Sequence, residues 1–217
     1  MNRQNQTAMR VIETGLRNHL RASHNRLSGT IEPQAVAAMA AVAGGLAKAL
    51  GLALTSPAGG RLRAGELTLL RPWLARTTAT ALAQSQGILA PLALAAAQDQ
   101  IQAMLHAVTV AGLAGGEWTG ARTAPRPSAL VASEWRELAV AEALAQAGER
   151  FNRRALDALE HAAAAGEDRA QTGKRLGPAL AALAADLATI ARTLVQAAAT
   201  AARLAAMAAL KTRIRPP

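Results

Sequence analysis

Large apolar side chains recur every three or four residues along the C-terminal part of the chain, from Pro178 to Pro217. This spacing predicts a long helix that lies along another helix. Its apolar stripe, here called the C-terminal seam, narrows to alanine at Ala197 and Ala201. The seam consists of Leu180, Leu183, Leu187, Ile190, Leu194 and Leu204. If the helix serves assembly, we expect the seam to be a continuous exposed stripe.

The same periodicity predicts five more helices before this one. The helices are expected to break at Ser28-Gly29, at Gly87 with Pro91, and at a turn over 166–177. Ser133 is the expected N-cap of the fifth helix. The six expected ranges are about 7–27, 33–54, 65–87, 88–113, 133–165 and 178–217, with 72 and 91 as alternative starts of the third and the fourth. Alanine favours helices over strands, and strand-favouring aromatics are scarce, with one Phe and no Tyr. The predicted fold class is therefore all-α, a helical bundle of about six helices with a long C-terminal helical hairpin.

A stretch rich in glycine and proline, GGEWTGARTAPRPS, is the best candidate for a boundary within the chain. It predicts a four-helix N-terminal part over 1–114, a loop or linker over 115–128, and the long helical hairpin over 129–217. Trp118 lies inside this stretch, where we expect it to pin the loop to the core. One domain overall is the alternative.

The chain is strongly basic, with a net charge of +10, and its basic residues are Arg except for Lys48, Lys174 and Lys211. Arginine and alanine enrichment together are typical of GC-rich bacterial coding. The predicted basic surface consists of Arg10, Arg17, Arg21, Lys211, Arg213 and Arg215. Eight of the 14 acidic residues fall within 134–168. Such a chain can bind itself head to tail or bind an anionic surface. Nucleic acid is a possible partner by charge, without stacking aromatics or a helix-turn-helix motif to support it.

Residues 35–54 are long enough to cross a membrane and carry one charge, Lys48. They are mostly Ala and Gly, and Ala41, Gly45 and Ala49 form an edge of small residues that suits close helix packing in bundles and in membranes alike. A buried bundle helix is the favoured interpretation, and membrane contact through 35–54 is the alternative. The start of the chain has no apolar signal region, and cysteine is absent, so the expected location is the cytoplasm.

The sequence offers no pattern that carries chemistry. His19 and His24 are five residues apart, which is the wrong spacing to share a helix face, and no histidine follows a glutamate by three residues. Gly173-Lys174 lacks the rest of a phosphate-binding loop, and the G-x-S-x-G pattern of serine hydrolases is missing. We therefore predict no catalytic, cofactor-binding or metal-binding residues and no cofactor.

The run AVAAMAAVAGGLAKALGLALTS, residues 35–56, is similar to the small-residue helix of the cyclodeaminase / methenyltetrahydrofolate cyclohydrolase family. The resemblance covers about residues 10–205 and implies an all-helical, dimeric enzyme. The chain departs from the family where a glycine-rich turn is replaced by Ile31-Glu32-Pro33-Gln34, and the family's Asp-containing turn is not recognisable at 173–177. No catalytic residue is carried over.

These patterns favour a non-enzymatic structural or interaction protein. We expect it to self-assemble, or to dock to an acidic partner, by close contact of helix faces lined with Ala and Gly. A component of a larger assembly, such as a secretion apparatus or a virion, is a role of this kind. The alternatives are the all-helical enzyme that the resemblance implies and a membrane-associating protein.

Overall fold

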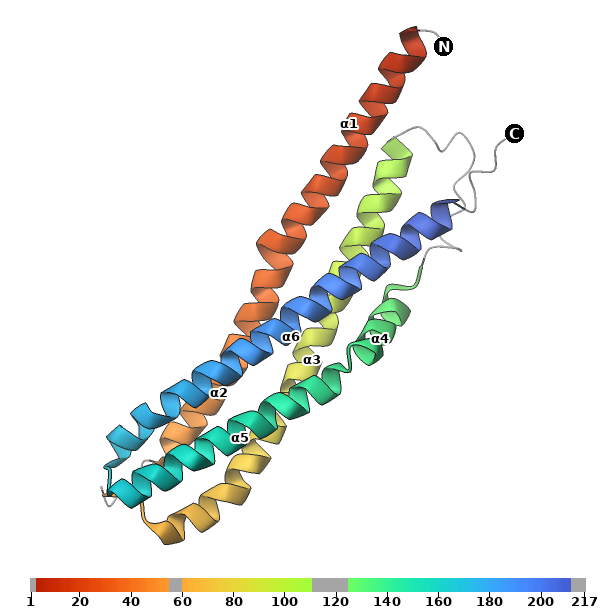
Figure 1. The fold of residues 1–217 in the computed structure, drawn as a ribbon. Coiled ribbons are helices and arrows are strands. Elements are labelled where there is room, and N and C mark those ends of the chain that lie inside the picture. The colour runs from red at the N-terminus through yellow and green to blue at the C-terminus, as the bar shows by residue number, and fades with distance from the viewer. Residues whose placement is uncertain (1–2, 55–59, 111–124, 212–217) are drawn as a thin grey trace. The chain divides into compact units, whose positions relative to one another are not determined.

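The computed structural model describes residues 3–54, 60–110 and 125–211, and the side chains of 14, 15, 17–54, 60–63, 65–106 and 125–209. Within these ranges the chain is helical between short connections and forms no strand; one isolated antiparallel bridge joins Arg61 and Asp168. The predicted all-α class is confirmed. The elements are α1 (Arg3–Arg26), the π-helical segment η1 (Leu27–Ile31), α2 (Glu32–Leu54), α3 (Ala64–Val110), α4 (Pro127–Glu137), α5 (Val140–Ala165) and α6 (Arg169–Lys211) (Figure 1).

The expected break at Ser28-Gly29 is a π-helical segment rather than an interruption. A π-turn admits an extra residue per turn without ending the helix. The Ser28 hydroxyl donates to the carbonyl oxygen of His24 at 3.0 Å, and Leu27 is buried, so the segment keeps both a hydrogen bond and an apolar contact. Helix therefore runs without interruption from α1 into α2.

The helices predicted over 65–87 and 88–113 are one helix, α3, which passes through Gly87 and Pro91. A proline within a helix costs about 3 kcal/mol because it removes one hydrogen bond and crowds the preceding turn. Burial offsets that cost, since Leu89 and Ala93 on either side of Pro91 are both fully buried. α6 likewise contains Pro178, where the preceding Gly177 has no Cβ to clash with the proline ring.

The long helix predicted over 133–165 is divided in the structure. Ser133, the expected cap, lies inside α4, and its hydroxyl donates to Glu137 at 3.0 Å. α4 ends at Glu137, and Ala139 has φ of 45°, in the left-handed region. A left-handed residue cannot continue a right-handed helix, so α5 starts afresh at Val140.

Changing Ala139 to Gly is expected to stabilise the protein by about 1 kcal/mol, because glycine adopts the left-handed conformation without the steric cost that alanine pays. The urea midpoint measures this change. Ala145→Gly, at an exposed position within α5, is the matched control and should lower stability by about 1 kcal/mol. Equal and downward shifts in both variants would contradict the strain assigned to Ala139.

The chain folds into two compact units, which are described separately. Unit 1 comprises 1–34, 90–138 and 193–217, and unit 2 comprises 35–89 and 139–192. Each unit gathers segments that are far apart in the sequence. Most of the predicted boundary at 115–128, with Trp118, lies outside the described residues.

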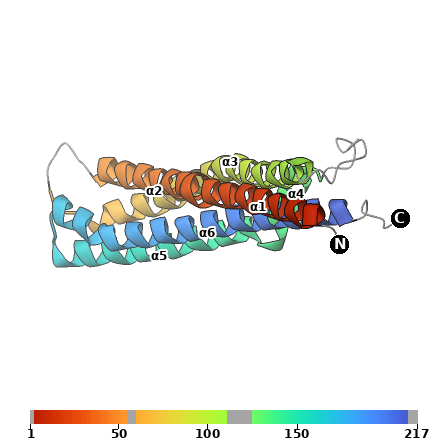
Figure 2. The ribbon, with the colours of Figure 1, turned by 90° about the horizontal axis from the view of Figure 1, so that it is seen from above.

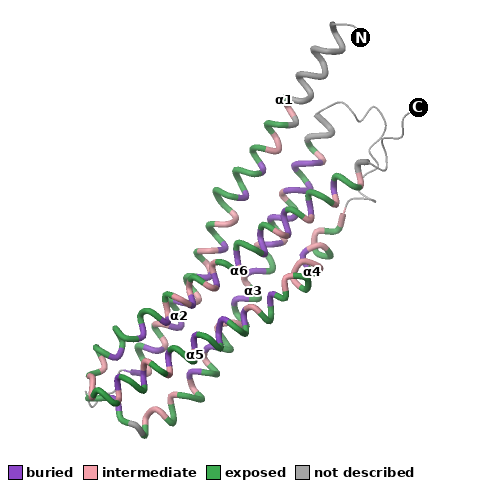
Figure 3. Tube along the Cα trace, in the orientation of Figure 1, coloured by how far each residue is buried: buried purple, intermediate pink, exposed green. Residues whose placement is uncertain are grey.

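Unit 2 is built around the buried face of α5. Phe151, the one phenylalanine of the chain, is buried there with Leu144 and Leu159, and buried and exposed positions alternate along α5 at helical spacing (Figure 3). α5 and the first part of α6 run side by side in Figures 1 and 2, and Arg150 donates to Asp186 across them at 2.8 Å. α3 also approaches α5 closely, because a Cβ added to Gly148 would lie 2.4 Å from Cδ1 of Leu82.

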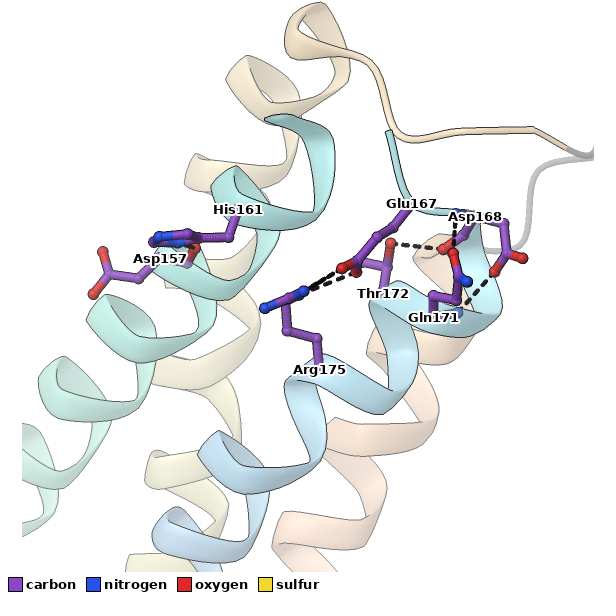
Figure 4. Close-up of polar contacts among 7 residues, drawn as sticks. All are labelled: Asp157, His161, Glu167, Asp168, Gln171, Thr172 and Arg175. Atoms are coloured by element: carbon purple, nitrogen blue, oxygen red, sulfur yellow. Dashed lines mark hydrogen bonds and ion pairs between the residues drawn. The ribbon is translucent and has the colours of Figure 1, made fainter. Parts of the chain in front are cut away.

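The turn between α5 and α6 explains why α6 begins earlier than predicted (Figure 4). Gly166 takes the left-handed conformation, with φ of 65°, that commonly ends a helix. A reciprocal capping box follows: Asp168 Oδ1 accepts from the Gln171 backbone N–H at 2.8 Å, and Gln171 Oε1 accepts from the Asp168 N–H at 3.1 Å. An ion pair between Arg175 and Glu167 closes the turn. α6 therefore starts at Arg169 instead of near Pro178.

Unit 1 is held by a polar cluster between α1 and α3. Ser23, which is fully buried, donates to Asp99 Oδ2 at 2.6 Å and accepts from Gln100 Nε2 at 2.7 Å. Arg26 donates to Asp99 Oδ1 at 2.7 Å from the solvent side. Hydrogen bonds in a partly buried network require one relative placement of two helices, which alanine contacts alone do not specify.

Candidate interaction groove

The C-terminal seam lies largely inside the molecule. Leu183 and Leu187 are buried within α6 of unit 2, and Leu194 is buried within α6 of unit 1. Leu180 and Ile190 are partly exposed, and Leu204 keeps 60% of its surface accessible. The seam is therefore not a continuous exposed stripe, because the chain's own helices cover its central positions.

The predicted basic surface is described only in part. Arg17 and Arg21 are exposed on α1. The side chains of Arg10 and Lys211, and the whole of Arg213 and Arg215, lie outside the described residues.

An open groove lies between α2 and α3 in unit 2, with a volume of about 840 Å³. We call it the α2–α3 groove. The residues that line it from α2 are Ala38, Ala41, Val42, Gly45, Leu46 and Ala49, and those from α3 are Arg76, Thr77, Thr80, Ala81, Gln84 and Ile88. The α2 side is thus made of small or aliphatic residues, and it contains the edge of small residues that the sequence predicts.

The small residues on α2 have open space in front of them. A Cβ added to Gly44, Gly45 or Gly51 would meet no atom within 4 Å. Ala41 is exposed as well. A small-residue edge stabilises a helix pair only when a second backbone comes close enough to contact it. Within unit 2 this edge borders the groove.

The polar side chains on α3 stand four residues apart, at Arg76, Thr80 and Gln84. The hydroxyl of Thr80 donates to the carbonyl oxygen of Arg76 at 3.0 Å, and that of Thr77 donates to the carbonyl oxygen of Trp73 at 2.9 Å. These hydroxyls are therefore engaged with their own helix. Arg76 brings the one charge among the lining residues, so the groove is weakly cationic. The α3 side of the groove could not be recognised from the sequence, because polar residues spaced four apart are common on solvent-exposed helix faces.

A second polar site in unit 2 anchors the start of α6. Arg169 donates to the carbonyl oxygen of Leu54, the last residue of α2, and to Glu66 Oε1 at 2.9 Å. Its Nε is buried and has no hydrogen-bond partner. The backbone N–H of Arg63 donates to Glu66 at 2.9 Å and lowers the pKa of that carboxyl, and Arg169 lowers it further. The ends of α2, α3 and α6 are tied together here, which is a structural role.

Glu167 has a lowered pKa as well, because Arg175 donates hydrogen bonds to it. A carboxyl whose pKa is lower in the folded state stabilises the fold above its unfolded pKa, about 4.3, and this contribution is lost as the pH falls through the folded pKa. Glu66 and Glu167 should both act in this direction.

We therefore expect the urea midpoint to fall between about pH 5 and about pH 3. The fall should be smaller in a variant that combines Glu66→Gln with Glu167→Gln. Glu142→Gln, on the exposed face of α5, is the control and should leave the pH dependence as in the wild type. If the urea midpoint of the double variant fell with pH as steeply as that of the wild type, the role assigned to the two carboxylates would be contradicted.

Among the described residues, no group of three or more His, Asp or Glu side chains is placed to hold a metal ion. Searches with protein-family models, curated proteins and solved structures found no match. The resemblance to the cyclodeaminase family therefore gains no support from these comparisons.

Three helices are long and apolar enough to cross a membrane, judged by length and composition alone: Arg17–Leu54, Gly65–His106 and Arg169–Ala209. In their most apolar windows only 28%, 22% and 33% of the residues are buried inside the molecule. Most residues of these windows are therefore not buried within the molecule.

Proposed function

We propose that the protein is a non-enzymatic helical interaction protein that self-assembles by helix packing. The observation that carries this proposal is the α2–α3 groove, in which the small-residue edge of Ala41, Gly45 and Ala49 borders open space. An alanine-rich helix gains little from burial at each residue, at about 25 cal/mol per Å² of apolar surface, so long and close contacts are what stabilise its association.

A helix from a second copy of the chain is the occupant that we propose. Arg76 in the groove and the exposed Lys48 on α2 are both cationic, and no acidic residue lines the groove. α5 exposes Glu142 and Glu149 to solvent. Cationic and acidic surfaces on one chain steer copies toward a head-to-tail encounter, and the apolar contact then holds them together.

The polar groups of the groove favour interaction over catalysis. An active site presents convergent polar groups toward a ligand. Thr77 and Thr80 instead donate to carbonyl oxygens of their own helix, and the rest of the lining is mostly Ala, Gly and aliphatic side chains. The role that we propose is that of a cytoplasmic component of a larger assembly.

The proposal is tested by the absolute mass of the wild-type protein, measured by light scattering at low salt and at about 0.5 M salt, where charge interactions between surfaces are screened. We expect an oligomer under both conditions, formed more slowly at high salt. A monomer of 22.3 kDa at both salt concentrations and at high protein concentration would overturn the proposal.

Membrane association is a second candidate, favoured by the three long helices whose apolar windows are mostly not buried. Lipid would cover those faces, and residues 35–54, whose single charge is Lys48, are the segment that we propose for membrane contact. Flotation with vesicles of phosphatidylcholine and phosphatidylglycerol tests it. Under this candidate the protein floats with the vesicles at high salt, whereas a protein that stays at the bottom of the gradient excludes stable insertion.

A further inference from the structure

Two histidines from distant parts of the sequence meet in unit 1. His19 on α1 and His106 on α3 have ring centroids 4.4 Å apart, with the ring planes at 82°. His106 is exposed and His19 is partly exposed, so solvent reaches the pair. Neither ring takes part in the hydrogen bond between Ser23 and Asp99.

This spacing is close to the one that a shared metal ion imposes. Zinc lies about 2.1 Å from a histidine nitrogen, and hence about 3.2 Å from the ring centroid. For an angle of about 90–109° between the two ligands, the centroids are then about 4.5–5.2 Å apart. The observed separation of 4.4 Å lies just below this range, and the perpendicular rings would have to turn for one nitrogen of each to face a common ion.

We propose that His19 and His106 form a two-histidine site for a divalent transition metal, of which Zn²⁺ is the probe of choice. Imidazole nitrogen suits zinc, copper and nickel, and it is a poor ligand for Mg²⁺ and Ca²⁺. Water would complete the coordination shell, because both side chains are accessible to solvent. The bound ion would cross-link α1 to α3 and stabilise their contact.

The ligands bind metal only as neutral imidazoles, so acid should weaken the binding. Stabilisation by a ligand that binds the folded state alone grows with the ratio of its concentration to Kd. Zn²⁺ should therefore raise the thermal midpoint of the protein at neutral pH, and Mg²⁺ should not.

Calorimetric titration of the metal-free protein with Zn²⁺ tests the site directly. We expect one saturable Zn²⁺ per chain in the wild type, lost in His19→Ala and in His106→Ala. The controls are His24→Ala, exposed on the same helix, and His161→Ala on α5, and both should keep the binding. His19→Phe retains an aromatic ring against His106 without a metal donor. It separates loss of the ligand from loss of the helix contact, and circular dichroism confirms that each variant is folded.

The absence of saturable Zn²⁺ binding in the wild type would overturn the proposal. Equal binding by wild type, His19→Ala and His106→Ala would overturn it too, since the ion would then sit elsewhere. Saturable Zn²⁺ binding by His19→Phe would also overturn the proposal, because that variant lacks one of the two ligands. Because the site lies in unit 1 and the α2–α3 groove lies in unit 2, these results are independent of the outcome for self-assembly.

Discussion

Replacing Phe151 with alanine is expected to lower the free energy of unfolding by about 3–5 kcal/mol, the cost of truncating a large side chain in a packed core. Phe151 is 1% exposed in unit 2. Its neighbours along the buried face of α5 include Ala147 and Ala155, both fully buried, which are too small to fill the cavity. Urea unfolding followed by circular dichroism measures the loss.

The matched control is Leu69→Ala on α3. Leu69 is also a large apolar residue of unit 2, but it is 75% exposed, so its truncation should change stability by no more than about 0.5 kcal/mol. Similar effects of the two substitutions would mean that Phe151 is not the centre of the core of unit 2.

The second large effect is expected in unit 1, where Asp99→Ala should cost about 2–3 kcal/mol. The substitution removes the acceptor of both Ser23 and Arg26, and it leaves the fully buried Ser23 hydroxyl without its 2.6 Å hydrogen bond. Ser23 would still accept from Gln100, but its buried O–H would have no acceptor, and an unsatisfied buried donor carries a desolvation cost.

Asp186→Ala provides the comparison on α6. Asp186 pairs with Arg150 at 2.8 Å, and both side chains are substantially exposed, at 34% and 45%. Exposed ion pairs contribute about 0–1 kcal/mol, so this variant should remain near the wild type in a urea titration. If Asp186→Ala were the more damaging of the two, the Ser23–Asp99 cluster would not be what fixes α1 against α3.

The all-helical class could be predicted because it depends on local properties. Alanine's helix propensity is visible in the sequence, and so is the three- and four-residue spacing from Leu183 through Leu187 and Ile190 to Leu194. The three leucines are indeed buried. Helix ends were harder to predict where two local signals conflict. Pro91 is a strong helix breaker, yet α3 continues past it. The burial of Leu89 and Ala93, which is a tertiary effect, offsets the cost of the proline.

The start of α6 could be predicted from its capping box. Asp168 and Gln171 have the spacing of a capping box, which places the start beside Asp168, whereas Pro178 suggested a start nine residues later than the observed Arg169. The division at Ala139 carries no comparable signal, since alanine is an unusual residue at positive φ.

The candidate site was predictable in part. The edge of small residues at Ala41, Gly45 and Ala49 is a sequence feature, and the structure places it in the α2–α3 groove. What the edge faces is a matter of tertiary structure, so Arg76 on the opposite wall could not be predicted. His19 and His106 were missed for the same reason, because only the packing of α1 and α3 brings them together.

The most direct test of self-assembly through the α2–α3 groove is the solution mass of Gly45→Leu beside Gly44→Leu, measured by light scattering. The two glycines are adjacent and exposed on α2, and an added Cβ meets no atom within 4 Å at either, so both variants should fold. Both gain about the same helix propensity.

Only Gly45 lines the groove, where a leucine side chain would occupy the space that we assign to the incoming helix. The account predicts an oligomer for the wild type and for Gly44→Leu, and a folded monomer of about 22.3 kDa for Gly45→Leu. An oligomer that persists in Gly45→Leu at the wild-type mass would contradict it.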